Sequence, residues 1–378
     1  AVFLSFVFFI VLGVIHVFDI ASSYIIYYYD WHYVHYAAIL MLMLVTLSAF
    51  VLMRPFRFMP KMPLYGIDWL GMVLWSIFIL SLIFVAQYGN QLDWLHSPYI
   101  RIAIGAAFIS LAFNIGRMTY IRHPFLEFAA FKTRNLINLL ILFLFFGILL
   151  STKNVLQNMF TGGVLHFDQL NTASLKWFEL AGMFIGAVFS WFALTRMKMS
   201  HKLLTFIGMT AVVLYVAMMY FLTSSYTNIE KLYLPLVCCG FGNVVIFIAL
   251  TVYAQATAPF KNYFQVLCIL GLIRTGIASP IGDAVYSHAM KGLLSKHLAA
   301  IGYDFNPAIQ LSAANVYSIN TEAFVATLQE LFGWSVLFGV IVLIAIAASR
   351  FKIGVKKPIP SLRGMYWVIM KERKILSH

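Results

Sequence analysis

Five ionisable residues interrupt stretches of sequence that are otherwise apolar. They are His16, Asp19, Glu179, Arg274 and Asp283. An ionisable side chain at membrane depth is costly unless it faces a partner or a water-filled cavity, so such residues are the default candidates for function. A carboxylate that takes up a proton on one side of a membrane and releases it on the other would act as a proton relay. The alternative is that each residue is a satisfied polar bridge between helices.

The spacing of these residues refines the prediction. His16 and Asp19 are three residues apart and share one face of a helix, and histidine titrates near neutral pH, which suits proton exchange. Arg274 stays charged and would fix a carboxylate or an anionic substrate. Arg274 and Asp283 fall on opposite faces of an ideal helix, so we do not expect them to pair unless the helix is bent. The proton-coupling candidates are therefore Asp19, His16, Glu179 and Asp283.

Uncharged polar residues in the same stretches form a second group. An amide at membrane depth either joins two helices or contacts a substrate, and both interpretations stay open. Together with Arg274, the candidates for a substrate cavity are Gln157, Asn158, Asn243 and Gln255. The sequence contains no His-Glu-x-x-His and no Gly-x-Ser-x-Gly motif, and its three cysteines lack zinc-type spacing. We therefore expect neither a cofactor nor enzymatic activity.

Ten apolar stretches must position these residues. Hydrophobic residues make up 62% of the chain and charged residues 10%, whereas soluble domains carry roughly a quarter charged residues. About 20 apolar residues cross a bilayer as a helix, and a helix satisfies its own backbone hydrogen bonds there. The sequence predicts an all-α membrane protein with spans at about 3–27, 35–53, 67–87, 99–116, 135–159, 173–195, 202–222, 232–255, 263–289 and 332–349.

Lysine and arginine fall on alternate connections between these stretches. The even connections and the tail are rich in them, as at Arg54, Arg117 and Arg196, whereas the odd connections hold few, among them Lys153 and Lys176. Cytoplasmic loops collect basic residues, so we expect the even connections and the C-terminus to face the cytoplasm. The net charge of +13 then serves topology and contact with membrane lipids, and we expect no nucleic-acid partner.

Three blocks and a tail divide the chain. Residues 1–53 hold two predicted helices, residues 54–134 hold two more, and residues 135–349 hold six. The tail, residues 350–378, alternates basic and apolar residues, as a helix on the inner leaflet would.

Two local features add further expectations. The connection at about 290–331 is long, and we expect its pieces Ala299–Tyr303 and Thr321–Leu331 to form short helices that lie flat against the bundle. The GxxxG motif from Gly182 to Gly186 predicts close packing of two helices.

Several motifs resemble the fourteen-helix drug:proton antiporters of the major facilitator superfamily, the EmrB/QacA-like group. Gly-Ile-Asp-Trp-Leu-Gly at 66–71 and the stretch from Gln87 to Ile100 resemble the entry and exit of family helix seven. Further similar segments are Leu156-Gln157, residues 190–208 and the pattern from Arg274 to Gly282.

This resemblance implies an architecture and a function. The ten spans would be family helices five to fourteen, with residues 1–53 a partial N-terminal bundle, 54–134 two linker helices and 135–349 a complete C-terminal bundle. Because the first four family helices are missing from this stretch, we expect it not to transport alone. The implied activity is proton-coupled efflux of apolar or cationic drug-like compounds by alternating access across a bacterial inner membrane. The implied partners are a periplasmic adaptor and an outer-membrane channel.

Other interpretations stay open. The protein could carry a different cargo, such as a lipid, bile salt or metabolite, or it could be a truncated remnant that does not transport. An intramembrane enzyme would need a histidine site, for which the sequence offers His166, His288 and His297.

Overall fold

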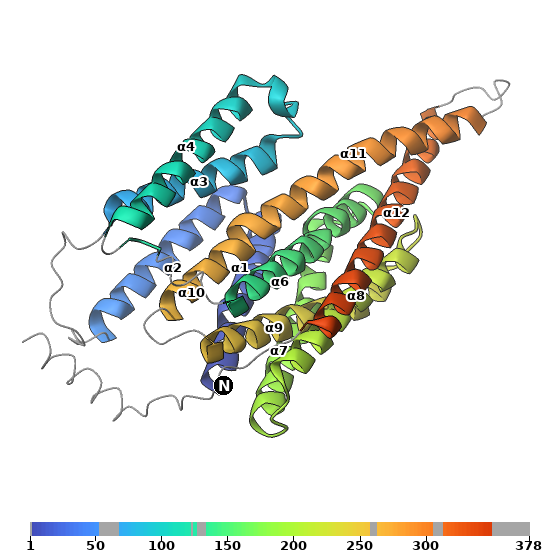
Figure 1. Cartoon of the computed structure of the whole chain (residues 1–378). Helices are drawn as coiled ribbons and strands as arrows, with labels where there is room; N and C mark the ends of the chain where they lie inside the picture. The colour runs from blue at the N-terminus through green and yellow to red at the C-terminus, as the bar shows by residue number, and fades with distance from the viewer. Residues whose placement is uncertain are drawn as a thin grey trace, which may run out of the picture.

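The described part of the protein is helical throughout. A computed structural model describes residues 2–52, 68–121, 124–126, 134–257, 263–304 and 313–349, and every regular element in these ranges is a helix (Figure 1). Ten helices within them are long and apolar enough to cross a membrane. The predicted all-α membrane class and the ten spans are confirmed. The expected tail helix lies outside the described residues.

The helices follow one another with few long connections. The first four are α1 (Val2–Tyr28), α2 (Trp31–Leu52), α3 (Trp69–Tyr88) and α4 (Pro98–Tyr120), with the short η2 (Trp94–His96) between the last two. The others are α6 (Arg134–Thr152), the π-helical η3 (Lys153–Gln157) and η4 (Phe160–Val164), α7 (Gln169–Thr195), α8 (His201–Leu222), η5 (Ile229–Leu232), α9 (Tyr233–Thr257), α10 (Tyr263–Gly271), the π-helical η7 (Leu272–Ala278), α11 (Ser279–Asp304) and α12 (Ala313–Ala348).

Glycines bring α7 and α9 into close contact at the centre of the bundle. A Cβ atom on Gly182 would meet the carbonyl oxygen of Val237, and one on Gly186 would lie 2.8 Å from the carbonyl oxygen of Phe241. The packing predicted from the GxxxG motif is confirmed. Gly240 of α9 in turn faces the carbonyl oxygen of Glu179, so no side chain at that position can intervene between the two helices.

Helix α1 packs antiparallel to α7. The rings of Phe9 and Phe184 are 5.6 Å apart at the centroids, and a Cβ atom on Gly13 would lie 3.4 Å from the Leu180 side chain. Residue numbers rise along α1 as they fall along α7, so the two helices run in opposite directions, as the predicted alternation of spans requires. Helix α2 packs against α1 and buries none of its residues.

The α3–α4 hairpin packs alongside α11 (Figure 1). At one end, Asp68 caps α3 by accepting a hydrogen bond from the Gly71 N–H (2.9 Å) and also binds the Arg117 guanidinium of α4 and the Phe125 N–H. Burial alone would raise the pKa of Asp68, but these hydrogen bonds from Arg117, Gly71 and Phe125 together hold the pKa below its usual range. At the other end, His288 of α11 bonds Asn90 (3.1 Å).

Helices α11 and α12 are longer than predicted. The 36 residues of α12 extend about 54 Å, while the hydrocarbon core of a bilayer is about 30 Å thick. The expected short, flat helices at Ala299–Tyr303 and Thr321–Leu331 are wrong. The first piece lies within the last turns of α11, and the second lies within α12. Both helices project together past their neighbours (Figure 1), and His297 of α11 contacts Glu330 of α12 at 2.8 Å.

Candidate functional site

Glu179 of α7 is the centre of a buried ionic cluster. Its side chain is 1% exposed, and its Oε1 lies 2.6 Å from Nζ of Lys153 and 3.7 Å from Nε2 of His16. The three residues come from α7, from η3 and from α1, respectively. Glu179 Oε2 and His16 Nδ1 are buried and have no hydrogen-bond partner among the described residues. The cluster therefore joins three helices, and two of its buried polar atoms make no hydrogen bond to the described residues.

The cluster lies well inside the bundle. From Gln169 to Glu179, helix α7 rises about 15 Å, and from Glu179 to Thr195 it rises about 24 Å. Each length is at least half the thickness of a hydrocarbon core, which is about 30 Å, so Glu179 is far from both ends of the helix. Glu179 and Lys153 can therefore lower the cost of being charged mainly by pairing with each other, because neither end of the helix is near.

A second, more exposed ion pair lies one turn away. Lys176 Nζ of α7 is 3.5 Å from Asp19 Oδ2 of α1, and the two side chains are 29% and 45% exposed. His16 and Asp19 do share a face of α1, as predicted, and this face meets α7. They do not contact one partner, however, because His16 faces Glu179 while Asp19 faces Lys176.

Lys153 is the site residue that the sequence analysis missed. Counted there among the basic residues of a connection, it lies instead within a single apolar span that runs from Leu136 to Val164. Its side chain reaches Glu179 at the start of the π-helical segment η3. The available signal was its position inside the predicted 135–159 span. Wide π-helical turns inside membrane helices are frequent at functional sites.

Arg274 lies in the π-helical segment η7 and contacts two residues of α9. Its Nη2 donates to Asn243 Oδ1 at 2.9 Å, and its guanidinium carbon lies 4.4 Å from the centre of the Phe247 ring. A cation over an aromatic face is stabilised by the ring quadrupole. Arg274 thus contacts an amide and a ring; no ion pair joins it to Asp283, and both residues are described.

The remaining cavity candidates are spread along the bundle. Gln157 accepts a hydrogen bond from the Tyr215 hydroxyl (2.8 Å), and both side chains are buried. Asn158 is exposed and donates to the Asn154 carbonyl oxygen. Gln255 lies near the end of α9, two residues before Thr257. Among the five candidates, a hydrogen bond joins Asn243 to Arg274, and Gln157 and Asn158 are neighbours in the chain.

Asp283 of α11 faces the region where α6 passes into η3. Its neighbours are the polar side chains of Ser151, Asn154 and Ser279. Of the proton-coupling candidates, Glu179, His16 and Asp19 thus lie around α7, and Asp283 lies apart from them on the α6 side.

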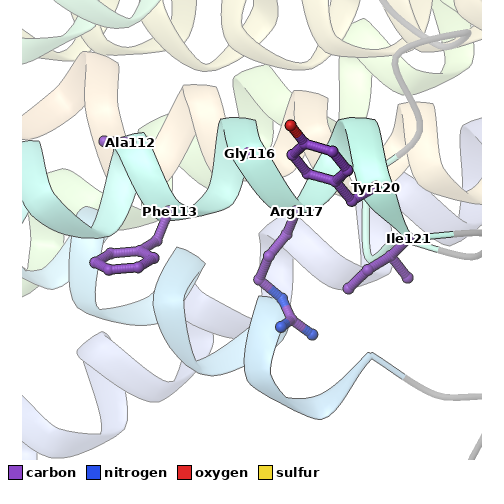
Figure 2. Close-up of a pocket in the computed structure, with 6 residues that line it drawn as sticks. All are labelled: Ala112, Phe113, Gly116, Arg117, Tyr120 and Ile121. Carbon is purple, nitrogen blue, oxygen red and sulfur yellow. The ribbon is translucent and has the colours of Figure 1, made fainter.

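Two surface hollows lie elsewhere. One of about 470 Å³ runs along α4 and is lined by Ala112, Phe113, Gly116, Arg117, Tyr120 and Ile121. In Figure 2 the Arg117 side chain points away from the ring of Tyr120, toward its ion-pair partner Asp68. The other, of about 140 Å³, lies between α6, Tyr253 and the end of α12. No sequence-predicted candidate lines either hollow.

Two of the three histidines considered for an enzyme bind partners in separate places. His288 bonds Asn90, and His297 pairs with Glu330. Within the described ranges no group of three His, Cys, Asp or Glu side chains is arranged to hold a metal ion.

No protein-family model matches the chain, and no curated protein matches it. Among solved structures, the chain is similar to a bacterial homologue of the human lysosomal transporter Spinster in an inward-facing, occupied conformation. The two share 14% sequence identity over 75% of this chain and 69% of that chain, with a TM-score of 0.46.

Proposed function

We propose that the protein is a secondary active transporter of the major facilitator type in which Glu179 exchanges a proton during transport. The observation that carries the proposal is the Glu179 carboxylate, 1% exposed at membrane depth between Lys153 and His16. An intramembrane ionisable residue paired in this way is typical of proton relays in pumps and transporters.

The geometry suggests how the exchange would act. When Glu179 is charged, Lys153 holds η3 against α7 through the 2.6 Å contact. A proton on Glu179 would remove the charge that Lys153 pairs with, and the buried ammonium would then favour a position nearer water. Protonation would thus be coupled to movement of η3 relative to α7, which is the kind of bistable element that alternating access needs.

The titratable groups around Glu179 come from every element packed against it. Lys153 of η3 and His16 of α1 are in contact, and Cys239 of α9 and Tyr215 of α8 lie close enough to interact electrostatically. Cysteine and tyrosine are neutral at physiological pH, so His16 is the group best suited to pass a proton to Glu179.

The remaining assignments follow from the family resemblance and the distribution of basic residues. The cargo is an apolar or cationic drug-like compound, moved outward in exchange for protons. The protein lies in a bacterial inner membrane with its C-terminus in the cytoplasm. On the other side of that membrane, a periplasmic adaptor and an outer-membrane channel would complete the export route.

The proposal is tested in inside-out vesicles from cells that express the chain from its own gene in its native membrane, together with any further helices that transport requires. Uptake of ethidium, a fluorescent apolar cation, is followed after a proton gradient is imposed. Glu179→Gln should reduce gradient-driven uptake at least tenfold, because the amide cannot exchange a proton. Asp93→Asn is the matched control: Asp93 is exposed in a left-handed conformation (φ 53°) that asparagine accepts. Its uptake should equal that of the unmodified protein.

An infrared measurement separates proton exchange from cargo choice. Difference spectra between two pH values should contain a carboxyl band that disappears in Glu179→Gln. A band that persists unchanged in this variant, or full ethidium uptake by it, rules out Glu179 as the coupling site.

A further inference from the structure

Asp283 lies in a small polar site made almost entirely of oxygen atoms. Around it are the hydroxyls of Ser151 and Ser279 and the carboxamide of Asn154. These neighbours are tied to one another: Ser151 Oγ donates to the Ser279 carbonyl oxygen (3.1 Å), and Asn154 Nδ2 lies 3.4 Å from Ser279 Oγ. The Ser151, Ser279 and Asn154 side chains each keep an oxygen lone pair that can bind a cation.

The carboxylate itself lacks a positively charged partner. No Lys, Arg or His of the described ranges forms an ion pair with Asp283, and its Oδ1 is buried without a hydrogen-bond partner there. Glu179 is different, because Lys153 neutralises it. An unpaired carboxylate at membrane depth needs either a proton or a bound cation.

The helices beside the site pack closely. A Cβ atom on Gly282 would meet the Ser151 side chain, and one on Gly147 would meet Ala278, so α6 lies directly against α11 and η7 there. The π-helical segment η7 ends at Ala278, directly before Ser279. Irregular turns of this kind in transporter helices supply backbone carbonyl oxygens to bound Na⁺ or protons.

We propose that Asp283, Ser151, Ser279 and Asn154 form a binding site for Na⁺. The donors are hard oxygen atoms, which suit alkali and alkaline-earth cations rather than transition metals. A single carboxylate among neutral oxygens balances one positive charge, whereas Ca²⁺ sites usually gather several carboxylates.

The position of the site gives the bound ion a role in transport, and this part rests on the proposed function. Asn154 follows Lys153 directly in η3, so the same turn of helix presents Asn154 to Asp283 and Lys153 to Glu179. Na⁺ at Asp283 would hold η3 toward α11 while the lysine holds it toward α7. Occupancy of the Na⁺ site and protonation of Glu179 would therefore bias the same element.

The test measures binding without transport. The melting temperature of the purified full-length protein in detergent is followed by tryptophan fluorescence as Na⁺ replaces choline at constant ionic strength. The melting temperature should rise with Na⁺ and level off. A ligand bound only by the folded state shifts the folding equilibrium by the factor 1 + [L]/Kd, about tenfold at ten times the Kd. Replacing choline by K⁺ should give a much smaller rise.

Substitutions locate the site. Asp283→Asn keeps the shape but removes the charge and should abolish the Na⁺ response. Ser151→Ala removes one oxygen without adding bulk and should raise the half-saturating Na⁺ concentration about tenfold. Asp93→Asn, at an exposed turn, should behave as the unmodified protein. Glu179→Gln should also keep the Na⁺ response, so a protein that binds Na⁺ but does not transport contradicts only the proposed function.

Three results would overturn the site. They are an equal rise with K⁺ or choline, a Na⁺ response that survives Asp283→Asn, and a melting temperature that depends on pH alone. The last result would mean that Asp283 holds a proton in place of a metal ion.

Discussion

Two lysine–carboxylate pairs lie one turn apart on α7, and their surroundings give them different properties. Lys153 and Glu179 are 2.6 Å apart with side chains 20% and 1% exposed. Lys176 and Asp19 are 3.5 Å apart with side chains 29% and 45% exposed. The chemical groups are the same, so the difference between the pairs comes from burial and distance.

Burial makes the inner pair sensitive to the loss of either member. Removing one partner of a buried pair leaves an uncompensated charge and costs about 3–5 kcal/mol, whereas an exposed pair contributes about 0–1 kcal/mol. A protonation event at Glu179 therefore has a large effect on the surrounding helices, and the same event at Asp19 has a small one. This contrast supports the proposal that Glu179, and not Asp19, exchanges the proton during transport.

The largest expected effect comes from separating the inner pair. Lys153→Met should destabilise the protein by about 3–5 kcal/mol, because Glu179 is left charged and unpaired. Lys176→Met, the matched change in the outer pair, should cost about 0–1 kcal/mol. Both are measured as shifts in melting temperature in detergent.

A double variant shows whether the stability lost in Lys153→Met is due to the unpaired charge on Glu179. Lys153→Met combined with Glu179→Gln removes both charges and should recover most of the stability lost in Lys153→Met alone. Equal destabilisation by the two single lysine variants would contradict the distinction between the pairs.

A smaller loss of stability should follow from pushing α9 away from the backbone of Glu179. Gly240→Ala places a Cβ atom against the Glu179 carbonyl oxygen, and overpacking of this kind costs about 1–3 kcal/mol. Gly292→Ala is the matched control, since a Cβ atom on this exposed helical glycine meets nothing within 4 Å. It should instead stabilise the protein by about 0.5–1 kcal/mol. Destabilisation by both alanines to the same extent would show that contact with Glu179 is not the cause.

Much of the architecture was predictable from local sequence. Apolar length identified the ten spans because each must satisfy its own backbone hydrogen bonds in lipid. The GxxxG at Gly182 identified a close helix contact because small residues are the local requirement for it. The lengths of α11 and α12 were not predictable in this way, since the parts that project past the neighbouring helices need no apolar run.

Individual residues of the site could be predicted from the sequence, but the contacts between them could not. Glu179 and His16 stood out because they are costly at membrane depth. Lys153 did not, because a lysine toward one end of an apolar stretch has the same sequence signature as a basic residue of a connection. Which helix faces Glu179 depends on how α1, α6 and α7 pack, and no spacing within one helix contains that information.

A third ion pair, between Asp68 and Arg117, tests the role of burial where the start of α3 meets the end of α4. Asp68 is 3% exposed and Arg117 29% exposed at the side chain, so the pair combines a buried acid with a partly solvated base. Asp68→Asn keeps the cap on α3, because asparagine caps as well as aspartate does, and removes the charge. Allowing for solvent screening of Arg117, we expect a loss of about 1–2 kcal/mol at neutral pH.

The pH dependence of this loss has a defined sign. Hydrogen bonds from Arg117, Gly71 and Phe125 outweigh the opposing effect of burial and hold the pKa of Asp68 below its ordinary value. The stabilisation is therefore fully present above about pH 4, the ordinary value for aspartate, and is lost as the pH falls through the lowered pKa of the folded state. The difference in melting temperature between the unmodified protein and Asp68→Asn should stay constant from pH 7 to about pH 4 and shrink below it. A difference that widens on acidification would mean that desolvation of the Asp68 carboxylate outweighs the hydrogen bonds from Arg117, Gly71 and Phe125.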